Sequence, residues 1–257
     1  MKDMILEKTE KYIATIMINR PGKLNALTPS MITSLEQKFE AIRDNPGVRV
    51  VVIGGVKSAF CAGVDVEGTS YNPLNSRIFL KTFNRMIKTI EMLPQPTIAM
   101  INGTAVSGGL ELALACTFRI AAKEAKLGLP EIKLGLVAAG GTTYRLPRLV
   151  GFSKAMEMSL LGDLMSGEEA AACNLVNWVV PGEDLIQRTQ ALAGRLADNP
   201  PIAMSLVKDT LYSSSVPHID SASLIEILSA SVNHYSEDKK EGLDAFFSGR
   251  KPRFRGE

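Results

Sequence analysis

Two glutamates, Glu111 and Glu131, are the candidate acid–base residues of this sequence. Glu111 lies in the stretch 108–115, whose other residues are glycine, leucine and alanine. A short helix is predicted there, and burying a carboxylate in so apolar a helix is costly without a partner or a task. Glu131 follows Pro130 at a second predicted helix start. Two carboxylates can orient one water and move one proton, so the pair is a candidate for acid–base chemistry; an ordinary surface position is the alternative for either residue.

Two turns of small residues accompany these glutamates, at 59–65 and 102–109. Each follows a predicted buried strand, and small residues let the backbone approach a ligand closely. Gly108 opens the helix that carries Glu111. The first N–H groups of a helix lack intrahelical acceptors, so Gly108 would offer an N–H to developing negative charge. Taken alone, however, either turn is better explained as a simple change of chain direction.

The surrounding elements alternate between strands and helices in the first half of the chain, which indicates an α/β fold. Strands are predicted over 12–19, 48–53, 96–101 and 117–122, and helices over 29–43, 77–92 and 108–115. Later segments are mostly helical: 142–149, 153–161, 167–173, 183–198, 201–213, 218–235 and 237–247. Thr28 is the expected N-cap of the first helix. A composition shift at Asn199-Pro200-Pro201 predicts a core over 1–199 and a helical region over 200–257.

Composition excludes several classes of function. The net charge of the 257 residues is +2, which argues against a nucleic-acid-binding surface. Three cysteines at unrelated spacings argue against a disulfide framework and favour a reducing, cytoplasmic compartment. No secretory signal or membrane span is expected. His218 and His234 lack metal-ligand spacing, so no metal is expected. The basic residues of 250–255 are either a solvated terminus or a phosphate contact.

Motifs spread over nearly the whole chain resemble the crotonase (enoyl-CoA hydratase/isomerase) superfamily. They are found, in order, at 18–27 (INRPGKLNAL), 60–65 (FCAGVD), 101–109 (INGTAVSGG), 127–131 (LGLPE), 145–148 (RLPR), 161–163 (LGD) and 237–252. The resemblance implies a spiral of strand–strand–helix units with a C-terminal helical trimerisation region. It also implies assembly as a homotrimer or as a homohexamer built from two trimers.

The resemblance assigns roles to matching positions. Val64 and Gly108 fall where the family supplies the two N–H groups of an oxyanion hole for the thioester oxygen of an acyl-CoA. The residues that fall where the family cradles coenzyme A are Lys23, Leu24, Ala62, Asp65 and Val66. Phe246 and Lys251 fall where the C-terminal helix reaches the nucleotide end, sometimes that of a neighbouring subunit.

Hydratases of the family resemble this chain in having glutamates at both carboxylate positions. By that resemblance, Glu131 donates the proton to the α-carbon and Glu111 positions the water, in an enoyl-CoA hydratase of fatty-acid metabolism. Coenzyme A belongs to the substrate, so no separate cofactor is expected. The alternatives are a double-bond isomerase, another acyl-CoA lyase or hydrolase, and a non-catalytic acyl-CoA-binding protein, which would need neither glutamate.

Three segments depart from the family pattern. Ala138 and Ala139 stand where hydratases have a proline and a glycine, in a loop expected to line the acyl site. Glu67 stands where many relatives have a lysine near the CoA phosphates. The polar stretch 68–75 is expected to be mobile and to shape the acyl pocket. These departures leave the acyl group open.

Overall fold

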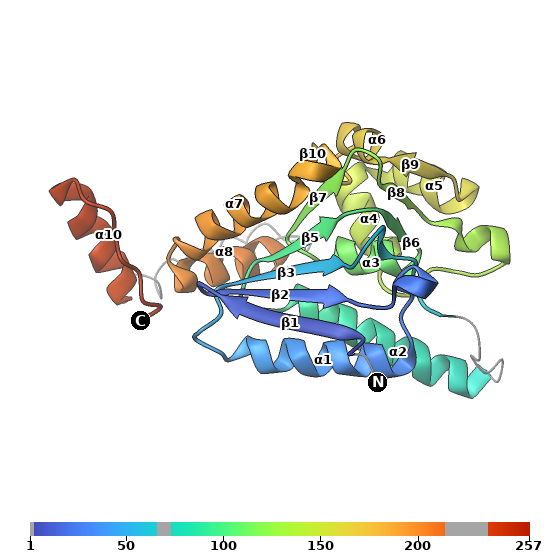
Figure 1. Ribbon diagram of the computed structural model, residues 1–257, viewed down its shortest axis with the longest axis horizontal. Helices are drawn as coiled ribbons and strands as arrows, with labels where there is room; N and C mark the ends of the chain where they lie inside the picture. Colours follow the sequence, from blue (N-terminus) through green and yellow to red (C-terminus); the bar gives the residue numbers. More distant parts are fainter. Residues whose placement is uncertain (1–2, 66–72, 214–235) are drawn as a thin grey trace.

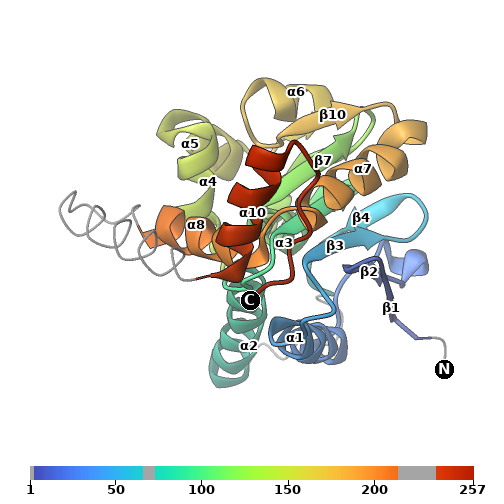
Figure 2. The same ribbon diagram turned by 90° about the vertical axis from the view of Figure 1, so that its left-hand side faces the viewer.

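The computed structural model describes residues 3–65, 73–213 and 236–257. The predicted helix over 218–235, Glu67 and the predicted CoA-binding residue Val66 lie outside the described residues. The rest forms two β-sheets with helices packed around them (Figures 1 and 2). No helix within the described ranges is long and apolar enough to cross a membrane.

The larger sheet has six strands in the order β1-β2-β3-β5-β7-β10. Their bounds are β1 Ile5–Glu10, β2 Ile13–Ile18, β3 Val50–Gly55, β5 Thr97–Ile101, β7 Phe118–Ala122 and β10 Trp178–Val180. β1 is antiparallel to β2, and the other neighbours are parallel. Every residue of β3 and β5 is buried. Parallel strands covered on both faces read as continuous apolar runs, which is why the sequence predicted these two.

The smaller sheet runs beside the first and has the order β4-β6-β8-β9. Its strands are β4 Ala59–Cys61, β6 Thr104–Val106, β8 Lys126–Gly128 and β9 Leu164–Ser166. Each of β3, β5 and β7 continues into β4, β6 or β8 and then into a helix. Those helices are α2 (Pro73–Glu91), α3 (Gly108–Leu114) and the 3-10 helix η2 (Pro130–Leu134). The chain thus repeats a strand–strand–helix unit, and the predicted α/β spiral is confirmed.

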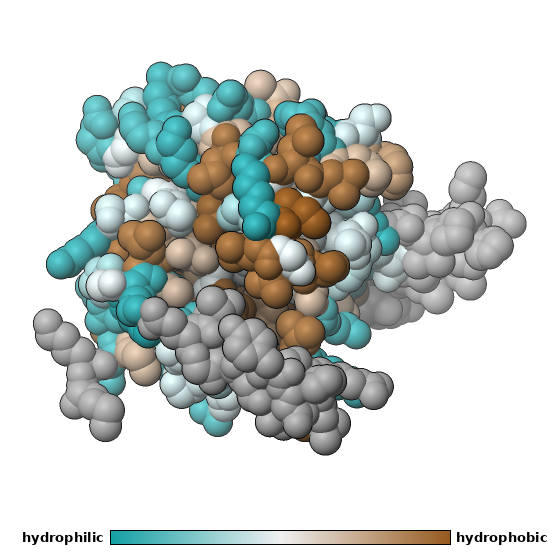
Figure 3. Space-filling model, turned by 90° about the vertical axis from the view of Figure 1, so that its right-hand side faces the viewer, coloured by the Kyte–Doolittle hydropathy of each residue, from teal (hydrophilic) through white to brown (hydrophobic). Residues whose placement is uncertain are grey.

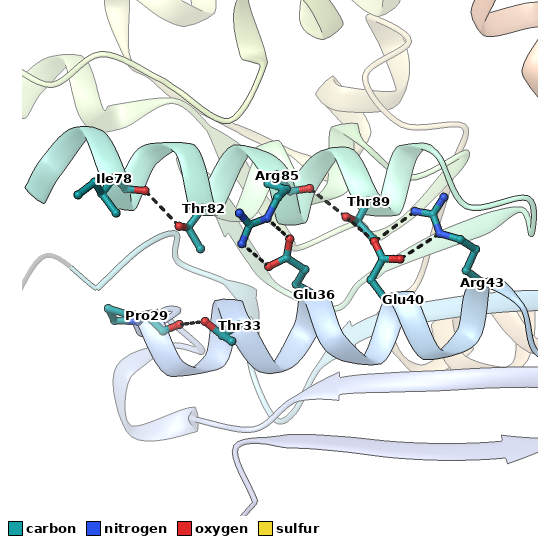
Figure 4. A network of polar contacts seen from close by, with 9 residues as sticks. All are labelled: Pro29, Thr33, Glu36, Glu40, Arg43, Ile78, Thr82, Arg85 and Thr89. Carbon is teal, nitrogen blue, oxygen red and sulfur yellow. Dashed lines mark hydrogen bonds and ion pairs between the residues drawn. The ribbon is translucent and has the colours of Figure 1, made fainter.

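Helix α1 (Pro29–Arg43) begins where the sequence placed it, because the Thr28 hydroxyl accepts a hydrogen bond from the Met31 N–H at 3.3 Å. It runs beside α2 along one side of the large sheet (Figure 1). Polar contacts join the two helices, among them an ion pair between Glu36 and Arg85 (Figure 4). Helix α7 (Leu185–Ala197) packs against the large sheet through contacts with β2, β3, β5 and β7.

Further helices follow the predicted order: α4 Thr142–Val150, α5 Phe152–Leu161, α6 Gly167–Ala172, α8 Pro201–Ser213 and α10 Glu237–Ser248. The described ranges also contain two short 3-10 helices, η1 (Pro21–Lys23) and η3 (Gly182–Asp184). Figure 1 shows α10 at one end of the molecule, away from α3 and β6. The division at residue 199 and the trimeric assembly stay predictions.

Several elements were not predicted. β1 alternates poorly, since Ile5 is its one buried residue, and so it has no strand signal. β4, β6, β8, β9 and β10 have three residues each, too few for a periodic pattern. Helix α2 begins at Pro73, four residues before the predicted start at 77, so residues 73–75 are helical and not part of a polar loop. The remainder of 68–75 lies outside the described residues.

Candidate active site

The two turns of small residues lie side by side because their strands are neighbours. β4 and β6 pair in parallel, so the chain leaves both strands at one edge of the small sheet. A Cβ built on Gly63 would lie 3.2 Å from the Gly108 nitrogen, and one built on Gly108 would lie 3.4 Å from the Val64 nitrogen. Within the described chain, neither the Val64 N–H nor the Gly108 N–H has a hydrogen-bond acceptor. Two such donors held together can bind one oxygen anion.

The backbone bends sharply before each of these donors. Gly63 has φ +98°, a conformation in which a side chain would be strained. Ser107 has φ 50° and ψ −126° although it carries a side chain, which costs about 1–3 kcal/mol. Two hydrogen bonds that Ser107 donates hold it in place: its N–H donates to the Gly128 carbonyl at 3.1 Å, and its hydroxyl donates to Glu131 Oε2 at 2.7 Å. The strain therefore sits at a residue that joins the α3 start to a candidate acid.

Glu111 is buried in α3, with 4% of its surface exposed. Its Oε1 atom accepts three hydrogen bonds: from the Gly140 N–H at 2.6 Å, from the Thr142 hydroxyl at 2.9 Å and from the Thr142 N–H at 3.4 Å. Burial raises the pKa of Glu111, and these three donors oppose the rise. The charge of Glu131 raises the pKa further, which places the two carboxyl groups in one electrostatic environment.

Glu131 lies in η2, as its position after Pro130 predicted, and it is 8% exposed. Neither glutamate is therefore the ordinary surface residue that formed the alternative explanation. The Ser107 hydroxyl on Oε2 leaves Oε1 of Glu131 for other contacts. Two buried carboxyl groups next to two N–H donors can hold a water and transfer a proton beside a carbonyl oxygen.

The ring of Phe83 lies beside both parts of the site. A Cβ on Gly108 would come within 3.0 Å of this ring. A Cβ on Gly140 would come within 2.7 Å of it and within 2.5 Å of Glu111 Oε2. A side chain at residue 140 would force Glu111 or Phe83 to move, and one at residue 108 would press on Phe83, so Gly108, Phe83 and Glu111 form one closely fitted unit.

Four of the predicted CoA-binding residues come together along the first turn, and these are Lys23, Leu24, Ala62 and Asp65. The segment that contains η1 runs beside the turn after β4. The Ala62 N–H donates to the Leu24 carbonyl at 3.0 Å, and the Asp65 N–H donates to the Leu27 carbonyl at 2.9 Å. Leu24 is 48% exposed although it is apolar, and its φ of 48° lies in the left-handed region. Its side chain is therefore available to a ligand.

Two residues that position this segment had not been assigned a role. Asn25 is fully buried: its side chain accepts from the Arg20 N–H at 2.9 Å and donates to the Ala59 carbonyl at 2.7 Å. Arg20 also forms an ion pair with Asp65 at 2.6 Å. Asn25 thus ties the segment to β4, and Arg20 ties it to the turn that follows β4. The motif at 18–27 contained both residues, but their partners become visible only when β4 is placed.

The C-terminal pair of predicted residues is not brought to this cluster. Lys251 forms an exposed ion pair with Asp198 at 2.6 Å, beside the end of α7. Phe246 belongs to α10, and its side chain lies outside the described atoms. Figure 1 shows α10 away from α3, so within a single chain neither this helix nor Lys251, which pairs with Asp198, joins the other candidates.

Gly140 and Thr142 are site residues that the sequence did not indicate. They lie 29 and 31 positions after Glu111, and no local pattern connects them to it. Both belong to the loop 135–142, which was expected to line the acyl site, and Thr142 was also expected as a helix start; a contact with Glu111 was not predicted for either. In the part of the chain that the structure describes, no three His, Cys, Asp or Glu side chains form a metal-binding group.

Comparison with known proteins decides the family. The family model for enoyl-CoA hydratase/isomerase matches residues 8–257. The chain belongs to the enoyl-CoA hydratase/isomerase family. It is 36% identical to the crotonyl-CoA hydratase of Syntrophomonas wolfei over 98% of each chain, and 37% identical to a probable enoyl-CoA hydratase of Bacillus subtilis over 96% and 97%. An enoyl-CoA hydratase structure from Bacillus anthracis superposes with a TM-score of 0.96 at 34% identity, covering 99% of this chain and 100% of that one.

Membership in the enoyl-CoA hydratase/isomerase family confirms the recognition made from the motifs and the crotonase-type fold. The family contains more than one activity, as its description states. A shared fold does not by itself fix the reaction. The reaction therefore has to be argued from Glu111, Glu131 and the two backbone donors.

Proposed function

We propose that this chain is an enoyl-CoA hydratase, which adds water across the 2,3 double bond of an enoyl-CoA. The observation that carries the proposal is the pair of buried carboxyl groups, Glu111 and Glu131, beside the N–H groups of Val64 and Gly108. An isomerase needs one base to move a proton between carbons, and an acyl-CoA-binding protein needs none. Retaining two buried carboxyl groups is costly unless both are used.

The proposed reaction balances with these groups alone. The thioester oxygen accepts from Val64 and Gly108, which stabilise the negative charge of the enolate. The water oxygen bonds to C3 while Glu111 takes one of its protons, and the C2–C3 π electrons move toward the thioester. Glu131 then gives its proton to C2. Exchange of a proton with the next water returns both carboxyl groups to their starting states.

The environment of Glu111 suits the part of the base. Its Oε1 is occupied by the three donors of the 140–142 segment, so Oε2 is left for the water. Burial raises the pKa of this carboxyl, and a base of higher pKa accepts a proton more readily. Glu131 has its Oε1 to hold the proton that C2 receives, with Oε2 fixed by Ser107.

The surface on the right-hand side of Figure 1, which includes η2 and α5, supports an acyl-CoA substrate. Figure 3 shows a broad hydrophobic area there. Exposed apolar side chains of η2, the loop after it and α5 are Leu134, Leu136, Val137, Leu160 and Leu161. We include in the proposal that Lys23, Leu24, Ala62, Asp65 and Val66 cradle coenzyme A. The only coenzyme needed is then the one that the substrate carries.

Assembly and location belong to the same proposal. Among the described residues, α8 exposes Val207 and α5 exposes Phe152 and Met156, which are apolar side chains that a second subunit would cover. We propose a homotrimer or a homohexamer in the cytoplasm, in which Phe246 and Lys251 of one subunit serve the CoA of another. Fatty-acid metabolism is the proposed setting.

The decisive experiment follows the ultraviolet absorbance of the conjugated enoyl thioester in crotonyl-CoA. A hydratase bleaches this absorbance, and the Glu111→Gln/Glu131→Gln double variant serves as the matched control. A protein that only binds leaves the absorbance unchanged and overturns the proposal. A 3-enoyl-CoA that gains the absorbance, with no bleaching of crotonyl-CoA, would assign the isomerase activity instead.

A further inference from the structure

The backbone of residues 139–141, which donates a hydrogen bond to Glu111, is itself bonded by other side chains. Gly140 and Gly141 are neighbouring glycines, and glycine has the widest choice of backbone conformations. A glycine N–H aimed at a catalytic carboxylate therefore needs an external restraint. Two side chains, Asn84 and Arg145, supply bonds to this backbone.

Asn84 acts on the peptide that donates to Glu111. Its Nδ2 donates to the Ala139 carbonyl at 2.9 Å. That carbonyl and the Gly140 N–H belong to one planar trans peptide and point in opposite directions. Fixing the carbonyl on one side thus fixes the N–H that lies 2.6 Å from Glu111 Oε1 on the other.

Arg145 acts on the next peptide. Its Nη1 donates to the Gly140 carbonyl at 2.7 Å, while Nε and Nη2 bind the two oxygens of Glu91 at 2.8 and 2.5 Å. Arg145 is 4% exposed, and such a two-point pair fixes the plane of its guanidinium group. Glu91 ends α2, where Lys208 of α8 donates to the Glu91 carbonyl at 2.7 Å and to the Leu93 carbonyl. The anchor of Arg145 is therefore fixed as well.

We propose that Asn84 and Arg145 form a clamp, positioning residues that hold the 139–141 backbone so that Glu111 keeps the orientation and charge state needed for hydration. The proposal rests on the proposed function, because it assigns Glu111 the part of the base. Neither clamp residue touches the reacting atoms. Each acts through the Gly140 peptide groups.

The clamp has a signature that a purely structural role lacks. The bond from Gly140 favours the ionised form of Glu111, so loosening it lets burial raise the pKa of Glu111 further. If ionised Glu111 is the base, the acidic limb of the kcat profile moves to higher pH. Glu131 is the titratable group whose charge, when it is ionised, raises the pKa of Glu111, and it remains in every variant.

The first variant is Asn84→Leu, which keeps the size of the side chain and removes the donor. We expect kcat for crotonyl-CoA to fall about 2- to 12-fold, the range of one neutral hydrogen bond, with KM changed less than about twofold. The acidic limb should move upward. The matched control is Glu36→Gln, which breaks the ion pair between α2 and α1 shown in Figure 4 without contacting the loop. It should leave kcat and the limb unchanged.

The second variant is the double change Arg145→Met/Glu91→Leu. Replacing both partners of a buried ion pair avoids an orphaned charge, so the fold is expected to persist. The thermal midpoint should stay near that of the wild type, whereas kcat should fall about 10- to 150-fold, the range for a hydrogen bond from a charged group. A folded double variant with wild-type kcat and an unmoved acidic limb overturns the clamp.

A separate measurement keeps this test independent of the activity. The carboxyl carbon of Glu111, labelled with ¹³C and identified by its loss in Glu111→Gln, can be titrated by NMR without substrate. Both clamp variants should titrate at higher pH than the wild type and Glu36→Gln. An unshifted titration rejects the clamp even if the wild type hydrates crotonyl-CoA. A shifted titration in a protein that does not hydrate it rejects the proposed function and leaves the clamp standing.

Discussion

The two candidate catalytic carboxyl groups are held in opposite ways. Glu111 projects from a helix in which every residue is buried, and it accepts bonds from two backbone N–H groups and one hydroxyl. Glu131 lies in a five-residue 3-10 helix with Glu131 as its one buried residue, and the described bond to its carboxyl group comes from the Ser107 hydroxyl. The main chain thus dominates one environment and a single side chain the other. A base that must orient a water gains most from rigid support.

Removing each carboxylate should have the largest effect. We expect Glu111→Gln and Glu131→Gln each to lower kcat about 10²- to 10⁴-fold, the range of one acid–base group. Glutamine keeps the shape and removes the titrating proton, so KM should change little. Steady-state hydration of crotonyl-CoA measures both. Near-full activity of Glu131→Gln would contradict its assignment as the donor to C2.

A substitution that crowds the site should have the next largest effect on kcat, and it should act on Glu111 and not on Glu131. In Gly140→Ala the new methyl group would lie 2.5 Å from Glu111 Oε2, so the carboxyl group or Phe83 has to move. A displacement of about 1 Å can cost roughly 10²-fold in rate. Gly194→Ala is the control, because a Cβ there meets nothing within 4 Å. Equal activities of the two variants would show that Glu111 is not tightly fitted.

The smallest effects should come from single hydroxyl groups, and they test the comparison directly. Ser107→Ala removes the described bond to Glu131, whereas Thr142→Val leaves Glu111 with its two backbone donors. Glu131 becomes charged as it gives its proton to C2, and loss of a hydrogen bond to a charged group costs about 1.5–3 kcal/mol. We therefore expect a fall in kcat of more than about tenfold for Ser107→Ala and of less than about tenfold for Thr142→Val.

The pH profile separates these two variants. The Thr142 hydroxyl lowers the pKa of Glu111, so Thr142→Val should raise it and move the acidic limb of kcat to higher pH. Ser107→Ala should leave that limb in place, because the Ser107 hydroxyl bonds Glu131 and not the Glu111 carboxyl group, and the bond from the Glu111 N–H to the carbonyl of residue 107 is kept. A reversed order of the two rate losses would mean that the main chain is not the stronger support.

Sequence patterns predicted the helices and the central strands, because those elements are long enough to show a period. The start of helix α1 was predicted to the residue, since Thr28 and Pro29 mark it. The smaller sheet was not predicted, because its strands have three residues each and are specified by pairing between distant segments. That sheet brings Val64 and Gly108 together. The closeness of their two N–H groups could therefore be inferred only from the family resemblance.

The candidate site shows the same limit. Glu111 and Glu131 could be found because an acidic residue in an apolar context is locally unusual. The partners Gly140, Thr142 and Ser107 are ordinary residues whose roles depend on contacts over 24 to 31 positions. Asn84 and Arg145 bond the backbone of Ala139 and Gly140, so they are one contact further from the Glu111 carboxyl group. A single sequence has no local signal for such contacts.

The unusual backbone of Ser107 implies a conflict between durability and catalysis. Its φ and ψ suit glycine, so Ser107→Gly would relieve strain worth about 1–3 kcal/mol. The same change would remove the hydroxyl that fixes Glu131. Selection for heat resistance alone would therefore favour glycine at this position, whereas selection for turnover would keep serine. A chain with serine at this position therefore has a less stable fold and a better-positioned acid than the same chain with glycine.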